Sequence, residues 1–182
     1  FQSTYGDDYR SMLLTALNGV GYSDLDELDD YFIHILKTQQ LIKNYVDDHA
    51  DQYIPAYMEE KQPRVVSHIL ISMDDASNPT EEEMARVNAV NDALNSGRDF
   101  GEVAQELSED SGSAIQNGSI GYMDADSSLV SPFLETALAL NEGEGSEWIQ
   151  TTYGWHIIKC DVTNVDTLKT YDEFYQALSS YY

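Results

Sequence analysis

Cysteine and basic residues are scarce in this 182-residue chain. The single cysteine, Cys160, excludes an internal disulfide, and its place in an apolar stretch predicts a buried side chain rather than a reactive thiol. Nine Lys and Arg residues stand against 33 Asp and Glu, which gives a formal net charge of -24. A surface this acidic repels nucleic acid and anionic membranes, so neither is expected as a partner. Whether the charge serves solubility or attracts basic partners stays open.

Long hydrophobic runs are also missing, and none approaches the roughly 20 residues that a membrane-spanning helix needs. The hydrophobic content of 42% is nevertheless that of a globular protein, and the length suits one medium domain or two small ones. No signal peptide is evident in the first residues, which predicts a chain that is either cytosolic or processed.

Two apolar stretches each carry a central histidine. Residues 64–72 are typical of one strand, and residues 146–152 and 155–160 of two more, joined through Tyr153 and Gly154. Side chains alternate along a strand, so His156 shares a face with Ile158 and Cys160. A histidine in such a run is a buried polar group that needs hydrogen-bond partners. Two strands therefore bring one imidazole each toward a common sheet.

Five blocks follow one another in order: RVVSHILI, DFGEVAQELSED, NGSIGYM, SPFLETALAL and TTYGWHIIK. Together they resemble a parvulin-type peptidyl-prolyl isomerase over residues 64–161. The resemblance implies an α+β domain at residues 63–161, an antiparallel sheet wrapped by helices. It also implies an isomerase that twists X-Pro bonds without a covalent step, and hence no cofactor and no metal. Its partners would be unfolded or extended polypeptides that contain X-Pro.

The resemblance also assigns the site. His68 and His156 match the paired strand histidines of the family, Thr151 the hydroxyl bonded to that pair, and Asp110 the group beside the reacting carbonyl. The residues expected to bind substrate are Leu129, Phe133, Leu138, Tyr153 and Tyr122. Leu138 replaces a frequent phenylalanine, and the family's Gly-Gly-Asp-Leu-Gly turn is Asn-Gly-Ser-Ile-Gly at residues 117–121. The change from phenylalanine to leucine conserves apolarity but alters the shape of the pocket.

Each assignment has a structural alternative. The two histidines serve either as a hydrogen-bonded scaffold or in direct contact with the substrate. Asp110 in a Ser/Gly-rich loop is by default a turn residue, and Leu129 and Phe133 are by default core residues. A zinc site from His68, His156 and Cys160 lacks the spacing of known zinc motifs and is not expected.

Helix signals flank the strands. Thr80 and Glu83 form a capping box for a helix that ends near Asn95 at Gly97, and Asp99 caps the next helix. Residues 108–121 are typical of a loop. Ser131 is expected to cap a helix whose first residue is Pro132.

Residues 1–62 hold helical patterns only, including one from Leu25 to about Val46 and a last one at residues 48–61, with Pro55 early in it or at a kink. Helical arms before a parvulin module resemble extracytoplasmic foldases of the PrsA type, and more distantly the periplasmic chaperone SurA. That resemblance implies a chaperone lobe at residues 1–62, completed by a helix within residues 162–182. It further implies a bacterial lipoprotein anchored outside the cytoplasmic membrane by a lipid that this chain does not carry, with dimerisation through the arms left open.

Two other function classes compete with the isomerase. A non-catalytic chaperone would bind extended proline-containing segments without accelerating their isomerisation. A structural interaction module would use the acidic surface for docking. Isomerase activity on an unmodified X-Pro peptide would distinguish the isomerase from both of these classes.

Overall fold

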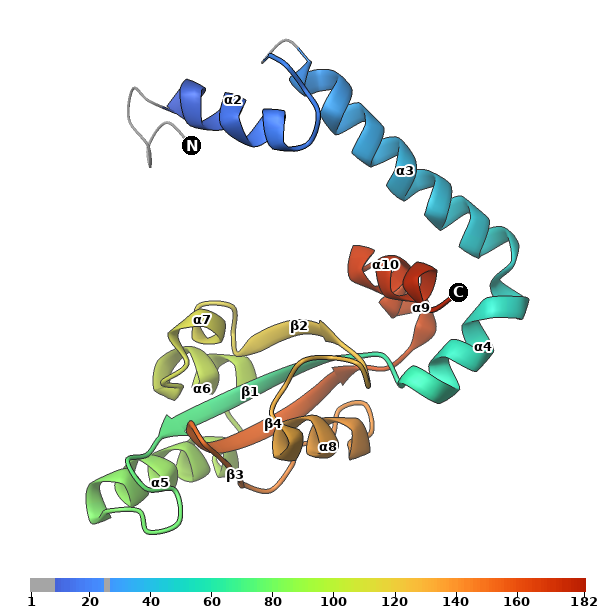
Figure 1. Ribbon diagram of the computed structural model, residues 1–182. Helices are drawn as coiled ribbons and strands as arrows, with labels where there is room; N and C mark the ends of the chain where they lie inside the picture. The colour runs from blue at the N-terminus through green and yellow to red at the C-terminus, as the bar shows by residue number, and fades with distance from the viewer. Residues whose placement is uncertain (1–8, 25–26) are drawn as a thin grey trace. The chain divides into compact units, whose positions relative to one another are not determined.

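The computed structural model describes residues 9–24 and 27–182, which form helices and one antiparallel sheet (Figure 1). The chain divides into two compact units between Ala50 and Asp51. The domain boundary predicted from the sequence lies at residue 62, and the helix between residue 50 and this boundary groups with the second compact unit. None of the helices described is long and apolar enough to cross a membrane.

The first unit contains the helices α2 (Tyr9–Gly19) and α3 (Leu28–Asp48). Leu25, where the sequence predicted the start of the second helix, lies outside the described residues. Both helices bury few side chains: Leu17 and Val46 are buried, whereas Phe32, Leu36 and Leu41 are exposed.

Apart from its first residue, the helix α4 (Ala50–Lys61) belongs to the second unit, and Pro55 lies at its sixth position. This helix packs against α10 (Asp172–Tyr181), which lies near the end of the chain. The ring of Tyr57 makes edge contacts with Phe174 and Tyr181, and both Tyr57 and Phe174 are fully buried. A short helix, α9 (Val165–Leu168), precedes α10 and was not predicted.

The sheet has four strands in the order β2-β1-β4-β3, all antiparallel to their neighbours. Their bounds are β1 (Arg64–Ser72), β2 (Ser119–Met123), β3 (Ile149–Thr151) and β4 (Gly154–Val162). The first strand was predicted with these bounds. The predicted strand at residues 146–152 is shorter, because the Ser146 hydroxyl accepts the Ile158 N–H and replaces a regular ladder contact.

Helices cover both faces of the sheet (Figure 1). On one face, Ile69 and Ile71 pack with Val87 and Val90 of α5 (Glu81–Asn95) and with Val103 of α6 (Phe100–Leu107). On the other face, α8 (Ser131–Ala139) covers a cluster formed by Val66, Met123, Phe133, Ala137, Leu140, Ile158 and Cys160. Strand alternation puts His68 and His156 on this second face, so both imidazoles lie beneath α8.

The predicted helix signals are present with one exception. The Thr80–Glu83 capping box forms, and Asp99 caps α6. The cap residue of α8, however, is Val130 rather than Ser131. Ser131 is the first residue of the helix, and its hydroxyl donates to Glu135 one turn later instead of accepting a backbone N–H as a cap would.

Candidate functional site

The two histidines come from neighbouring strands and contact each other directly. In the β1–β4 register, His68 lies opposite Ile158 and His156 lies opposite Leu70, so the two rings are diagonal neighbours on one face. Their Nδ1 atoms are 3.1 Å apart, and the rings are almost parallel, with centroids 5.3 Å apart. Both side chains are buried, so this contact satisfies polar atoms that water cannot reach.

Asp110 lies at the other nitrogen of His68. It is the cap residue of α7 (Ser111–Ala114), a helix that the sequence had suggested was part of a loop. Asp110 Oδ2 is 2.8 Å from His68 Nε2 and 2.7 Å from the Ser113 hydroxyl, while Oδ1 accepts the Gly112 N–H. Burial alone would raise the pKa of Asp110, but hydrogen bonds from Ser113, His68 and Gly112 outweigh it and lower this pKa.

Thr151 closes the network at its far end. Its hydroxyl oxygen is 2.8 Å from His156 Nε2 and also accepts the Tyr153 N–H. Because the ionised carboxylate of Asp110 only accepts, His68 Nε2 must donate, and a neutral His68 then accepts at Nδ1. His156 therefore donates from Nδ1 and accepts the Thr151 proton at Nε2. Every donor points toward Asp110, a set of tautomers inferred from the hydrogen-bond partners.

His156 is held neutral by its surroundings. Burial, followed by the nearby His68, lowers the pKa of His156 from 6.5 to about 4, although Asp110 acts in the opposite direction. At neutral pH the polar floor of the site therefore carries its negative charge at Asp110, whose side chain is 34% exposed. The floor thus consists of hydrogen-bonded side chains held in fixed orientations, with the Asp110 carboxylate at its edge.

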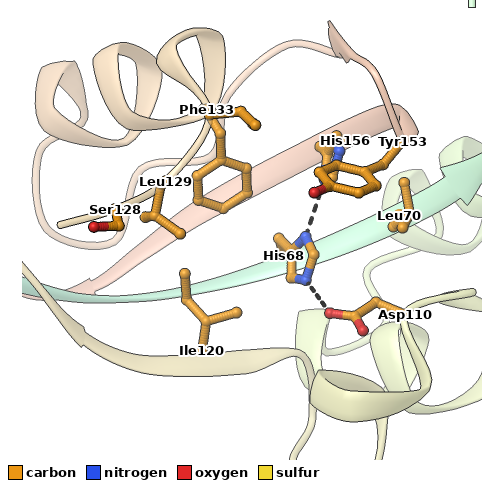
Figure 2. Close-up of a pocket in the computed structure, with 10 residues that line it drawn as sticks. His68, Leu70, Asp110, Ile120, Ser128, Leu129, Phe133, Tyr153 and His156 are labelled. Atoms are coloured by element: carbon orange, nitrogen blue, oxygen red, sulfur yellow. Dashed lines mark hydrogen bonds and ion pairs between the residues drawn. The ribbon is translucent and has the colours of Figure 1, made fainter.

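An apolar wall stands over this floor. The Phe133 ring makes edge contacts with both imidazoles, at centroid distances of 5.4 Å to His68 and 5.5 Å to His156. Figure 2 shows Ile120, Leu129 and Phe133 on one side of His68 and Asp110 on the opposite side. The cavity between floor and wall has a volume of about 320 Å³. It is lined by His68, Leu70, Asp110, Ile120, Ser128, Leu129, Val130, Phe133, Tyr153 and His156.

Six of the predicted site residues line this cavity: His68, Asp110, Leu129, Phe133, Tyr153 and His156. Thr151 is not among the lining residues but holds His156 from the side of β3. The structure thus brings together residues that are up to 88 positions apart in the chain.

Leu138 and Tyr122 are not among the described residues that line the cavity. Leu138 is five residues beyond Phe133, which rotates it about 140° around an α-helix, and it packs against the core cluster beneath α8. The Tyr122 hydroxyl lies 2.5 Å from that of Tyr57 and donates to Asp124. Burial raises the pKa of Tyr57 and of Tyr122, so both phenols stay protonated in this cluster.

The sequence did not indicate five residues of the site. Leu70 and Ile120 resemble any other core position, and Ser128 and Val130 lie in a segment without a distinctive pattern. Ser113, whose hydroxyl is 3.0 Å from His68 Nε2, follows Asp110 by three residues. That spacing is the usual one for a helix cap, so it carried a signal that reasoning about a loop had missed.

Comparisons with known proteins agree with the resemblance seen in the sequence. The family model of the rotamase, PPIC-type PPIase domain matches residues 68–162. Foldase protein PrsA 3 of Bacillus anthracis is 37% identical over 171 residues, which are 92% of this chain and 52% of that protein. Foldase protein PrsA of Clostridium kluyveri is 27% identical over 87% of this chain and 48% of its own length.

Among solved structures, the crystal structure of PrsA from Bacillus subtilis aligns with 99% of this chain and 63% of its own. Its TM-score is 0.49, and its sequence identity is 25%. The chain thus spans about half the length of the curated foldases that it matches.

Proposed function

The chain belongs to the PPIC-type parvulin family of peptidyl-prolyl isomerases, and on that basis we propose that it isomerises unphosphorylated X-Pro bonds in extended client polypeptides. It would do so as part of a foldase of the PrsA type that acts on secreted proteins outside the cytoplasm. One observation carries the proposal: an apolar cavity rests on a buried, hydrogen-bonded pair of histidines, with Phe133 over both rings.

The proposed mechanism involves no covalent bond. Rotation about a peptide bond faces a barrier of roughly 18–20 kcal/mol, because twisting destroys amide resonance. The twisted amide is less charge-separated than the planar one, so an apolar cavity that excludes water favours the twisted form. Phe133, Leu129 and Ile120 would hold the proline ring, while the carbonyl side of the bond rotates above the floor.

The network beneath the cavity would act as a rigid floor. Hydrogen bonds join its four members in one chain, so that each side chain holds the orientation of its neighbour. In order, these members are Asp110, His68, His156 and Thr151. Because such a floor does not rearrange while the bond rotates, no free energy of reorganisation is added to the barrier. Asp110, the exposed end, is the member placed to meet the carbonyl of the residue before proline.

Charge supports a preference for unphosphorylated substrates. The loop after β1 carries Asp74 and Asp75 and no Lys or Arg. A basic side chain at this end of the strand, Arg86, donates to the Glu109 carboxylate and to the Ser72 carbonyl. A phosphate adds about -1.5 to -2 charges, which would lie close to carboxylates rather than to a free guanidinium.

The remaining parts of the proposal concern the whole protein. Lipid anchoring outside the cytoplasmic membrane and client binding by the helices α2 and α3 follow from the resemblance to PrsA-type foldases. The exposed Phe32, Leu36 and Leu41 of α3 suit a surface that binds unfolded chains. Dimerisation through these helices is a further proposal of the same kind.

Phe133→Ala tests the site against the rival chaperone function. We expect kcat/KM for an unmodified Ala-Pro peptide to fall about 5- to 30-fold, because losing the apolar wall forfeits roughly 1–2 kcal/mol of contact with the proline ring. Phe133 is also a core residue, so Leu140→Ala, in the same cluster but outside the cavity, is the matched control for lost packing. Folded Phe133→Ala with the rate of Leu140→Ala would show that the proline ring does not sit against Phe133. Wild-type protein that binds the peptide without accelerating its isomerisation would establish the non-catalytic chaperone instead.

A further inference from the structure

A second cavity of about 320 Å³ lies beside the edge strand β3. It is walled by the loop after β1, by the start of α8 and by β3 with the turn that follows it. Its lining residues are Ala76, Ser77, Val130, Pro132, Gln150, Thr151 and Thr152. No step of the mechanism proposed above involves this second cavity.

The chemistry of the lining is unlike that of the chain as a whole. The protein carries a net charge of -24, yet no charged side chain is among the described residues that line this cavity. Ala76, Val130 and Pro132 contribute apolar surface, and both threonines contribute methyl groups. A cavity of this kind gains free energy from an uncharged, apolar side chain and loses it on burying a charge.

The second cavity adjoins the first. Val130 lines both, and Thr151 lines the second while its hydroxyl contacts His156 in the first. Alternate side chains of an extended peptide are about 7 Å apart on one face. Two cavities that share a wall residue are therefore within reach of neighbouring side chains on one bound peptide.

The position of β3 indicates what kind of molecule fills the cavity. This strand is at the edge of the described sheet, after β4 in the order β2-β1-β4-β3. An edge strand offers backbone hydrogen-bonding groups to an extended chain, and that mode of binding suits a polypeptide rather than a compact small molecule. The residue before proline is itself biased toward an extended conformation.

The walls of the cavity are already held in place. The Trp155 indole N–H donates to the Ala76 carbonyl at 2.8 Å, and the Ser77 N–H donates to Asp75 Oδ1 at 2.9 Å. The same loop is tied to α5 by the Asp74 N–H, which donates to the buried Glu83 carboxylate. A preformed cavity avoids the ordering cost that a mobile loop would impose on binding.

We propose that this second cavity is a subsite for an apolar side chain of the client, within two residues of the proline held in the first cavity. The proposal rests on the proposed function, because it takes the first cavity as the proline seat. It narrows the substrate class to X-Pro segments flanked by aliphatic residues, such as those that become buried when a client folds.

The test uses the whole chain and a set of peptides in which Leu replaces Ala at each of the two positions before and after a single proline. Binding is measured by titration, with the amide signals of residues 150–152 followed by NMR, and isomerisation is measured as kcat/KM. We expect Leu at one of these positions to bind about fivefold more tightly than Ala, equivalent to about 1 kcal/mol from partly burying the larger side chain. Signals of residues 150–152 should shift more with that peptide.

Two variants locate the effect. Ala76→Leu fills the cavity and should abolish the preference for Leu while leaving the all-alanine peptide unaffected. Ala139→Leu, at an exposed alanine of α8 outside both cavities, is the matched control and should keep the preference. Thr152→Lys, at an exposed position on the rim, should replace the preference for Leu by one for Glu, and it keeps the test valid if Ala76→Leu does not fold.

The outcomes separate the two proposals. Wild-type protein that isomerises the all-alanine peptide but shows no preference for Leu at any position overturns the subsite. So does a preference that survives in both Ala76→Leu and Thr152→Lys. Absence of isomerisation with a cavity-dependent preference in binding refutes the enzyme but retains the subsite.

Discussion

Acidification should destabilise the second unit through His156. Burial, and then the proximity of His68, lowers the pKa of this imidazole to about 4, whereas an unfolded chain restores 6.5. The unfolded state therefore binds more protons between these two values, and the stability of the folded state is present above pH 6.5 and lost as the pH falls toward 4. At pH 5 the loss amounts to about 2 kcal/mol relative to pH 7.5, and it approaches about 3 kcal/mol near pH 4.

The measurement is urea unfolding at several pH values between 7.5 and 5, followed by tryptophan fluorescence. Both tryptophans, Trp148 and Trp155, pack in the apolar cluster on the far side of the sheet, so the signal reports on the second unit. Many carboxylates also titrate in this range, and in a chain this acidic their protonation relieves repulsion. The comparison is therefore with His156→Gln, which removes this imidazole and keeps every carboxylate of the chain.

We expect the free energy of unfolding of the wild type to fall by about 2 kcal/mol more than that of His156→Gln between pH 7.5 and 5. His34→Gln, at an exposed position in the first unit, should retain the wild-type dependence on pH. Parallel curves for the wild type and His156→Gln would refute the reasoning, because they would mean that the buried imidazole titrates as it does in the unfolded chain.

Three further predictions follow from the same geometry. His68→Ala should lower the free energy of unfolding by roughly 1–3 kcal/mol, because His156 and Asp110 lose a buried partner, and catalysis lost at an unchanged melting temperature would favour direct participation instead. Gly118→Ala should cost about 1–3 kcal/mol more than Gly143→Ala. Both glycines have φ near +80°, but a Cβ on Gly118 would lie 2.6 Å from the His68 carbonyl oxygen, whereas one on Gly143 meets nothing within 4 Å. Peptides with Lys before proline should have a higher kcat/KM at low salt than those with phospho-Ser, and raising the salt should narrow the difference. The reverse order at low salt would contradict the assignment of the acidic loop to the substrate path.

Signals confined to one segment of the chain were read correctly. The bounds of β1, the Thr80–Glu83 capping box and the cap at Asp99 depend only on neighbouring residues, and the structure has all three. Pairing of His68 with His156 required more, since it depends on the register of two strands far apart in sequence. The sequence predicted that each strand brings one imidazole to a common sheet, and only the register of β1 with β4 made the two side chains neighbours on one face.

Features decided by tertiary packing were missed or misplaced. Ser131 has the usual identity of a cap, but its hydroxyl donates to Glu135, and the chain enters α8 through Val130. Tyr122 lies on the same strand as the cavity residue Ile120, but its hydroxyl forms a hydrogen bond with that of Tyr57 in α4. No pattern in the neighbouring sequence indicates this contact. Leu138 belongs to an apolar helix face that is too broad to show from the sequence which side meets the cavity.

The state of His156 bears on how the histidines serve the proposed reaction. With a pKa of about 4, roughly one molecule in a thousand carries a protonated His156 at pH 7. A general acid this rarely charged would contribute little, and rotation about an amide bond transfers no proton that requires one. The Thr151 hydroxyl and the Asp110 carboxylate fix the two rings at either end, and Phe133 covers both. The arrangement thus favours a rigid floor in which His156 stays neutral, and in the proposed reaction the carboxylate at its edge, Asp110, would act on the rotating carbonyl and on the charge of the neighbouring residue.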